Sequence, residues 1–78
     1  MIGELDRVVL AVDLPEHGLV AGDMGTAVLV HEGGRAYEVE FVTLGGETAA
    51  LLTLYAEQVR AGTAADLPHA RKLVLAGD

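Results

Sequence analysis

Two glutamates at alternate positions are the residues of this sequence best spaced for chemistry. Glu38 and Glu40 lie in a run that alternates polar and apolar residues, so a strand would project both carboxylates from one face, about 7 Å apart. That separation is close to one that paired catalytic carboxylates use. Glutamates at alternate positions of a half-exposed strand are nevertheless the ordinary solvated face of a sheet. We therefore expect both side chains to face solvent, where a partner can reach them.

The other chemically capable residues are scattered along the chain. His17, His31 and His69 share no ligand spacing, whereas a metal site needs several ligands at one point. Asp13 or Glu16 beside His17 could form an acid/base pair, but the sequence has no cysteine and no serine to serve as a nucleophile. We predict a non-enzymatic protein with no catalytic residue, no metal site and no cofactor.

Glycines punctuate the segment that leads into the second expected strand. Gly22 and Gly25 bracket Asp23, and glycine adopts positive φ angles without steric cost. A strand follows this segment, and the Gly-Lys-Ser/Thr ending of a phosphate-binding loop is missing. We assign Gly18, Gly22, Asp23 and Gly25 to a structural turn.

Composition narrows the classes of partner. The 78 residues carry a formal net charge of −7, with twelve acidic and five basic side chains. Such a chain repels nucleic acid and anionic lipid, so a basic protein is the favoured partner, although acidity also serves solubility alone. No stretch approaches the roughly 20 apolar residues that cross a bilayer. We expect a cytoplasmic protein that contacts neither a membrane nor nucleic acid.

Alternation and turn residues predict a chain of short strands. The expected strands are Asp6–Val12, Thr26–Glu32, Ala36–Val42, Thr48–Leu54 and Val59–Arg60. Two-residue and longer hairpin turns are expected at Gly33–Gly34 and Leu44–Glu47, and a single helical turn at Tyr55–Gln58.

This pattern predicts an all-β protein, a small five-stranded SH3-like barrel over residues 1–60. Residues 61–78 form a C-terminal tail that is flexible or that pairs with a barrel edge or a partner. The competing interpretation is a helix over Ala49–Arg60, where alanine and leucine are good helix formers.

The expected strands divide their apolar residues between two faces. The interior is predicted to hold Val8, Leu10, Val12, Val28, Val30, Tyr37, Val39, Phe41, Leu52 and Leu54. The same alternation turns outward Val9, Ala11, Ala27, Leu29 and Leu51. Because a contiguous exposed apolar patch usually marks an interface, either a partner or the run Leu73-Val74-Leu75 of the tail is expected to cover it.

An ordered series of short motifs spans residues 2–60. It consists of Glu4-Leu5-Asp6-x-Val8-Val9-Leu10, Asp13-Leu14-Pro15-x-x-Gly18-Leu19, Gly22-Asp23-x-Gly25-Thr26, Tyr37-Glu38-Val39-Glu40-Phe41 and Gln58-Val59-Arg60. In this order the motifs resemble the small bacterial family known as domain of unknown function 4926. The resemblance implies a single SH3-like barrel and carries over no catalytic residue. Some members lie beside other small proteins, which implies an antitoxin-like, immunity-like or accessory role.

These observations predict a protein-protein interaction module, in which acidic charge steers the encounter and apolar contacts hold the complex. The candidate interface residues are Arg7, Val9, Leu29, Glu38, Glu40 and Leu51. A nucleic-acid-binding module is the first alternative, because the segment Gly22-Asp23-x-Gly25-Thr26 is similar to the turn of KOW modules. A structural homo-oligomer is the second.

Overall fold

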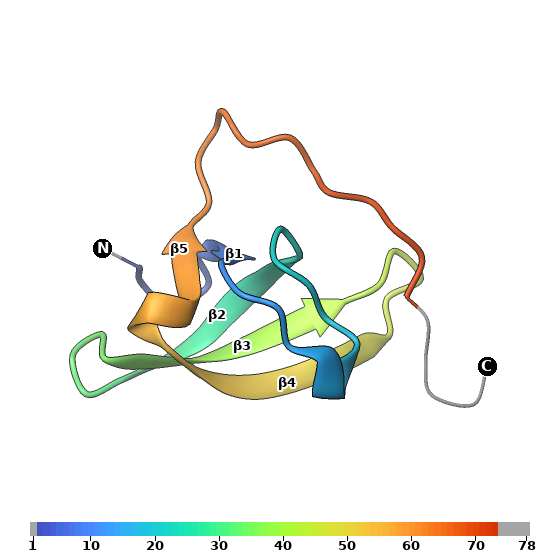
Figure 1. Ribbon diagram of the computed structural model, residues 1–78. Coiled ribbons are helices and arrows are strands. Elements are labelled where there is room, and N and C mark those ends of the chain that lie inside the picture. The colour runs from blue at the N-terminus through green and yellow to red at the C-terminus, as the bar shows by residue number, and fades with distance from the viewer. Residues whose placement is uncertain (1, 74–78) are drawn as a thin grey trace.

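Five antiparallel strands in one sheet make up the protein. The computed structural model describes residues 2–73 and contains β1 (Arg7–Leu10), β2 (Met24–His31), β3 (Ala36–Val42), β4 (Thr48–Tyr55) and β5 (Val59–Ala61). Two short 3₁₀ turns, η1 (Pro15–His17) and η2 (Ala56–Gln58), complete the elements, and residues 2–73 contain no α-helix. The strand order is β4-β3-β2-β1-β5 (Figure 1). The all-β prediction is confirmed.

The strand predictions are confirmed in position and differ at their ends. The observed β3 has the expected bounds, whereas β2 begins two residues early because Met24 pairs with Val9. The first strand is shorter than expected, since the chain leaves the sheet after Leu10 and closes a small loop through a bridge between Leu14 and Leu19.

The helix considered for residues 49–60 is wrong. β4 pairs with β3 from one end to the other, and the backbone hydrogen bonds of that ladder outweigh the helix propensity of alanine and leucine. A single helical turn follows, as expected, and its start is fixed by the Gln58 side chain, which accepts a hydrogen bond of 2.7 Å from the Tyr55 N–H. The turn redirects the chain into β5, which pairs with β1.

The hairpin between β2 and β3 is longer than the sequence predicts. Four residues, Glu32–Arg35, connect the strands, where a two-residue Gly-Gly turn was expected. Glu32, Gly33 and Gly34 all adopt positive φ angles, of 48°, 67° and 106°. The second expected turn is confirmed: the Thr43 N–H donates to the Glu47 carbonyl and the Gly46 N–H to the Thr43 carbonyl.

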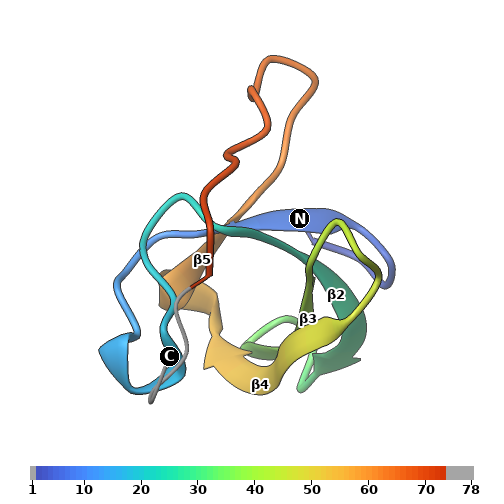
Figure 2. The ribbon, with the colours of Figure 1, turned by 90° about the vertical axis from the view of Figure 1, so that its right-hand side faces the viewer.

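The sheet curls around an apolar core, seen end-on in Figure 2. Val8, Leu10 and Val39 are its most deeply buried large side chains. The inward direction of Tyr37, Val39 and Phe41 on β3 is confirmed, and Leu54 of β4 joins them. Ala50 and Leu52 are half-buried and pack against this cluster, whereas Val12 lies outside it at the surface. No strand pairing joins β4 to β5 among the described residues.

Two residues expected to face solvent are buried instead. A register shift between Ala27 and Leu29 makes Val28 an extra, half-buried residue, so Ala27 points into the core and is 0% exposed. Val9 is outside the core cluster but only 6% exposed. Its direct cross-strand neighbours are Met24 of β2 and Arg60 of β5, whose long side chains share its face. The outward apolar patch is therefore smaller than predicted.

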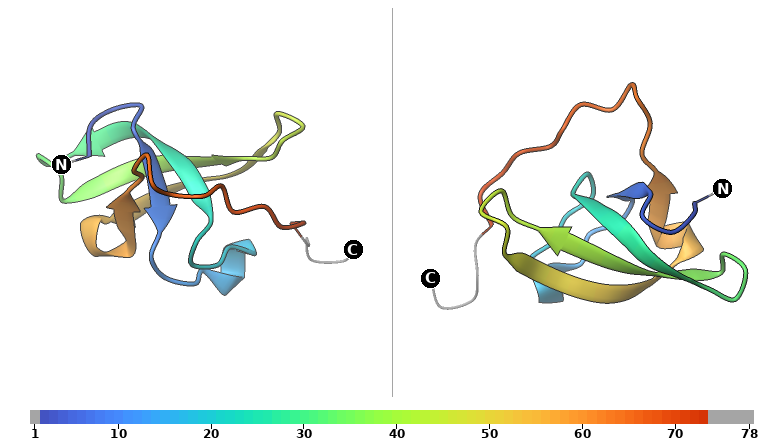
Figure 3. Two further views of the ribbon diagram at one scale, coloured as in Figure 1. Left: turned by 90° about the horizontal axis from the view of Figure 1, so that it is seen from above. Right: turned by 180° about the vertical axis from the view of Figure 1, so that it is seen from behind.

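The chain beyond β5 takes no regular structure within residues 62–73. It leaves the sheet as an arch, visible from above and from behind in Figure 3, and returns to the loop that precedes β2. Leu73 is half-buried, and the expected cover by Val74 and Leu75 lies outside the described residues. No described helix is long and apolar enough to cross a bilayer.

Candidate functional site

The candidate interface residues converge on the outer face of the sheet, except for Val9. One row of cross-strand neighbours contains Arg7, Thr26, Glu40 and Leu51, from four strands. The next row contains Leu29, Glu38 and Thr53. We call these two rows the outer strip. Within it Leu29 is 43% and Leu51 57% exposed, so two leucines stand in solvent beside two glutamates.

Threonines of β4 fix both carboxylates of the outer strip. The Thr53 hydroxyl donates to Glu38, and the Thr48 hydroxyl donates to Glu40 over 2.8 Å. Each glutamate is half-exposed and is hydrogen-bonded across the strand pair. This arrangement holds two negative charges at fixed positions among apolar side chains, as an interface does for a partner of opposite charge.

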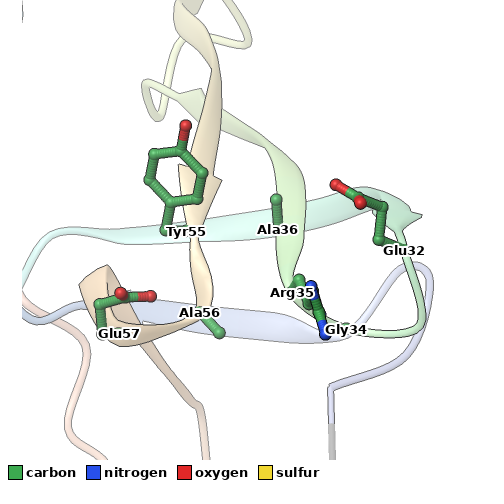
Figure 4. A pocket seen from close by; sticks show the side chains of 7 residues that line it. All are labelled: Glu32, Gly34, Arg35, Ala36, Tyr55, Ala56 and Glu57. Carbon is green, nitrogen blue, oxygen red and sulfur yellow. The ribbon is translucent and has the colours of Figure 1, made fainter.

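A shallow open hollow lies at one end of the sheet, and sequence reasoning missed it. Its volume is about 480 Å³, and its lining comes from the β2–β3 loop, the ends of β3 and β4 and η2. Figure 4 shows the Tyr55 ring beside Ala36, with Glu32 and Glu57 at the two sides. Tyr55 pairs with Ala36 across the strands, so its exposed ring extends the outer face toward this hollow. The aromatic residue Tyr55, at the start of the expected helical turn, is the sequence feature that could have indicated this hollow.

Asp23 is the second missed residue, because the sequence suggested only a turn. Asp23 is 8% exposed, and its carboxylate accepts a hydrogen bond of 2.9 Å from the Val20 N–H. Arg71 donates to both carboxylate oxygens, from Nε to Oδ1 over 2.8 Å and from Nη2 to Oδ2 over 2.5 Å. Nη2 also donates to the Gly18 carbonyl over 2.8 Å. His69 Nε2 lies 3.3 Å from Asp23 Oδ1.

Glycines shape this loop in two different ways. Gly18 and Gly22 have φ angles of 69° and 100°, in the region that other residues rarely adopt. A Cβ on Gly22 would also lie 3.6 Å from the His69 ring, so the histidine approaches the turn closely at this glycine. Gly25 was expected in the turn, but it lies in β2 opposite Val8 and has no positive φ angle, so its assignment to the turn is wrong. It is required by close packing, because a Cβ there would lie 2.8 Å from Val39 Cγ1.

Opposing effects set the charge state of Asp23. Burial on its own raises the pKa of this carboxyl, but the hydrogen bonds from Arg71 and Val20 and the charges of Arg71 and His69 outweigh it. The pKa of Asp23 is therefore lower than its usual value, and the pKa of Arg71 is raised by the same hydrogen bonds. The pair is ionised throughout the physiological range.

A second ion pair anchors the start of the arch. Arg60 of β5 donates to both oxygens of Asp66, over 3.1 and 2.7 Å. The Arg60 hydrogen bonds, with a further one from the Thr63 N–H, hold the pKa of Asp66 far below its usual value. The two ends of the arch are thus each fixed by an arginine and an aspartate.

A comparison with protein families places all five strands in a single family domain. The model of a family described as Domain of unknown function (DUF4926) matches residues 4–61, more than half of the chain. The chain belongs to this family. Comparisons with curated proteins and with solved structures gave no significant match. The match ends with β5, so Asp23 and the outer strip belong to the family domain, whereas His69 and Arg71 lie beyond it.

Proposed function

We propose that this protein is a non-enzymatic interaction module that binds another protein through the outer strip. The observation that carries the proposal is the mixture of exposed Leu29 and Leu51 with Glu38 and Glu40 on one face. Apolar side chains supply the contact area of an interface, and fixed charges select its partner.

The partner is a basic protein, for which the chain serves as an antitoxin-like, immunity-like or accessory subunit. A net charge of −7 attracts a basic surface over several ångströms and raises the rate of encounter. Arg7 at one end of the strip adds a positive charge two strands away from Glu40, and this asymmetry favours one orientation of the partner over its reverse.

The supporting scaffold is an SH3-like barrel. Two observations favour it: the strand order β4-β3-β2-β1-β5 with a helical turn between β4 and β5, and the strong curl of the sheet in Figure 2. Such a scaffold presents its outer face on short antiparallel strands, each hydrogen-bonded to at least one neighbour.

The test compares two double variants in cells of the native host. Leu29→Ser with Leu51→Ser removes the apolar contacts of the strip, and Leu44→Ser with Leu67→Ser removes two exposed leucines elsewhere. We expect the natural chain and the control to recover the same stoichiometric basic protein, and the strip variant to lose it. Recovery by all three chains, or by none, contradicts the proposal. Salt-sensitive retention of RNA would instead favour the nucleic-acid alternative, and self-association measured by mass in solution would favour the homo-oligomer.

A further inference from the structure

The loop before β2 presents a set of acceptors that matches one chemical group. We propose that residues 18–23 form an arginine-binding site, which Arg71 fills within the chain and which also takes up an arginine side chain of a peptide partner in place of Arg71. The site uses no residue of the outer strip, so it stands independently of the proposed function.

The fit is geometric. A guanidinium group carries its N–H donors in a planar fork, and here one edge of the fork meets both oxygens of Asp23. The remaining donor of Nη2 meets the Gly18 carbonyl. One guanidinium group therefore neutralises the Asp23 carboxylate and donates to three acceptors, the two Asp23 oxygens and the Gly18 carbonyl oxygen. A lysine ammonium is a point charge on a flexible stem and does not reproduce the parallel pair.

The acceptors are held in place without the tail. Asp13 Oδ1 accepts from the Ala21 N–H, and the Leu14 and Leu19 backbones exchange hydrogen bonds across the loop. The loop is also joined to β1, because Gly22 N–H donates to the Leu10 carbonyl and Leu10 N–H to the Asp23 carbonyl. A binding site built in advance loses little entropy when its ligand arrives.

The arginine that fills the site comes from outside the family domain. Asp23 and Gly18 lie within residues 4–61, and Arg71 lies ten residues beyond the end of the last strand. Without the guanidinium, the Asp23 carboxylate loses two parallel donors and keeps the Val20 N–H and the neighbouring His69 ring, whose Nε2 lies 3.3 Å from Oδ1. A buried carboxylate in that state favours any arginine that reaches it.

The tail sets the affinity for such a ligand. A tethered group competes at an effective concentration of roughly millimolar, so an external arginine must exceed the tail in affinity or arrive with further contacts. Removing Arg71 removes this competitor. The proposal therefore predicts a gain of binding on deletion of a side chain, which a purely structural ion pair does not produce.

The experiment titrates ¹⁵N-labelled full chains with a seven-residue peptide that copies residues 67–73. The chains are the natural protein, Arg71→Ala and Lys72→Ala, and the control peptide replaces its arginine with lysine. Lys72 is exposed and neighbours Arg71, so its variant removes equal charge without touching the site. The signals of the Val20, Gly22 and Asp23 amides report binding.

We expect the arginine peptide to bind Arg71→Ala about tenfold more tightly than it binds the natural chain or Lys72→Ala. We also expect the lysine peptide to bind Arg71→Ala about tenfold more weakly than the arginine peptide does. No binding to Arg71→Ala, equal binding of the two peptides, or shifts that spare residues 18–23 would overturn the proposal.

Discussion

Arg71 donates two hydrogen bonds to the Asp23 carboxylate although the two residues are 48 positions apart in the chain. The contact joins the tail to the family domain at a nearly buried acid. We therefore expect the stability of the domain to depend on a residue that lies outside it.

Replacing Arg71 with alanine leaves that acid without its charged partner. We expect the free energy of unfolding to fall by about 1–2 kcal/mol, because the Asp23 carboxylate loses two charge-assisted hydrogen bonds and keeps only the Val20 N–H and the neighbouring His69 ring. Arg71→Lys should restore part of the loss. Urea unfolding at neutral pH measures the change, with Lys72→Ala as the control; identical midpoints for Arg71→Ala and the natural chain would show that the contact is energetically neutral.

The Asp23 contact also gives the protein an acid-sensitive component of stability. The pKa of Asp23 is lowered from 3.8 in the folded chain, so its stabilisation is present above that value and is lost as the pH falls through the lowered pKa. In Arg71→Ala we expect the pKa of Asp23 to rise, because burial remains and its largest opposing partner is gone. An NMR titration of the Asp23 carboxyl in both proteins measures the shift, and an unchanged pKa would rule out control by Arg71.

Gly25→Ala should destabilise the sheet by overpacking. The new Cβ would lie 2.8 Å from Val39 Cγ1 and 2.9 Å from the Glu40 carbonyl oxygen, and the backbone atom has little room to move. We expect a loss of about 1–3 kcal/mol. Gly45→Ala is the matched control, since its Cβ would meet only Thr43 Oγ1, at 3.7 Å. Equal thermal midpoints for the two variants would contradict the prediction.

Two valines of β3 offer a paired test of the core. Val39 is fully buried and Val42 is half-exposed near the end of the same strand. Val39→Ala should cost about 2–3 kcal/mol through lost burial and the cavity that it leaves. Val42→Ala should change the free energy of unfolding by much less, so comparable losses in chemical denaturation would place the core elsewhere.

Local patterns predicted the strands, because side-chain alternation and turn residues act over a few positions. Tyr37, Val39 and Phe41 point inward as their spacing indicates, and the helical turn at Ala56–Gln58 follows β4 as expected. The same reasoning fails at a β-bulge. The extra residue Val28 breaks the alternation of side chains along β2, so Ala27 faces the core and is buried.

Among the residues of the candidate site, local patterns likewise placed some correctly and missed others. Leu29 and Leu51 were placed outward correctly: Leu51 lies in a regular part of the β3–β4 pairing, and Leu29 lies just after the bulge, where the expected alternation resumes. The burial of Val9 was missed because β1 is a central strand, with neighbours from β2 and β5 on both sides of Val9 that local alternation does not reveal. The pairing of Asp23 with Arg71 had no local signal, because a single acid and a single base far apart match in many combinations.

The arch between Ala61 and His69 connects β5 to the Asp23 contact without belonging to the sheet (Figures 1 and 3). A single proteolytic cut inside it would leave all five strands uncut and separate the segment that carries Arg71 from the family domain. The arch thus offers a point at which cleavage would unmask a carboxylate on an otherwise unchanged domain.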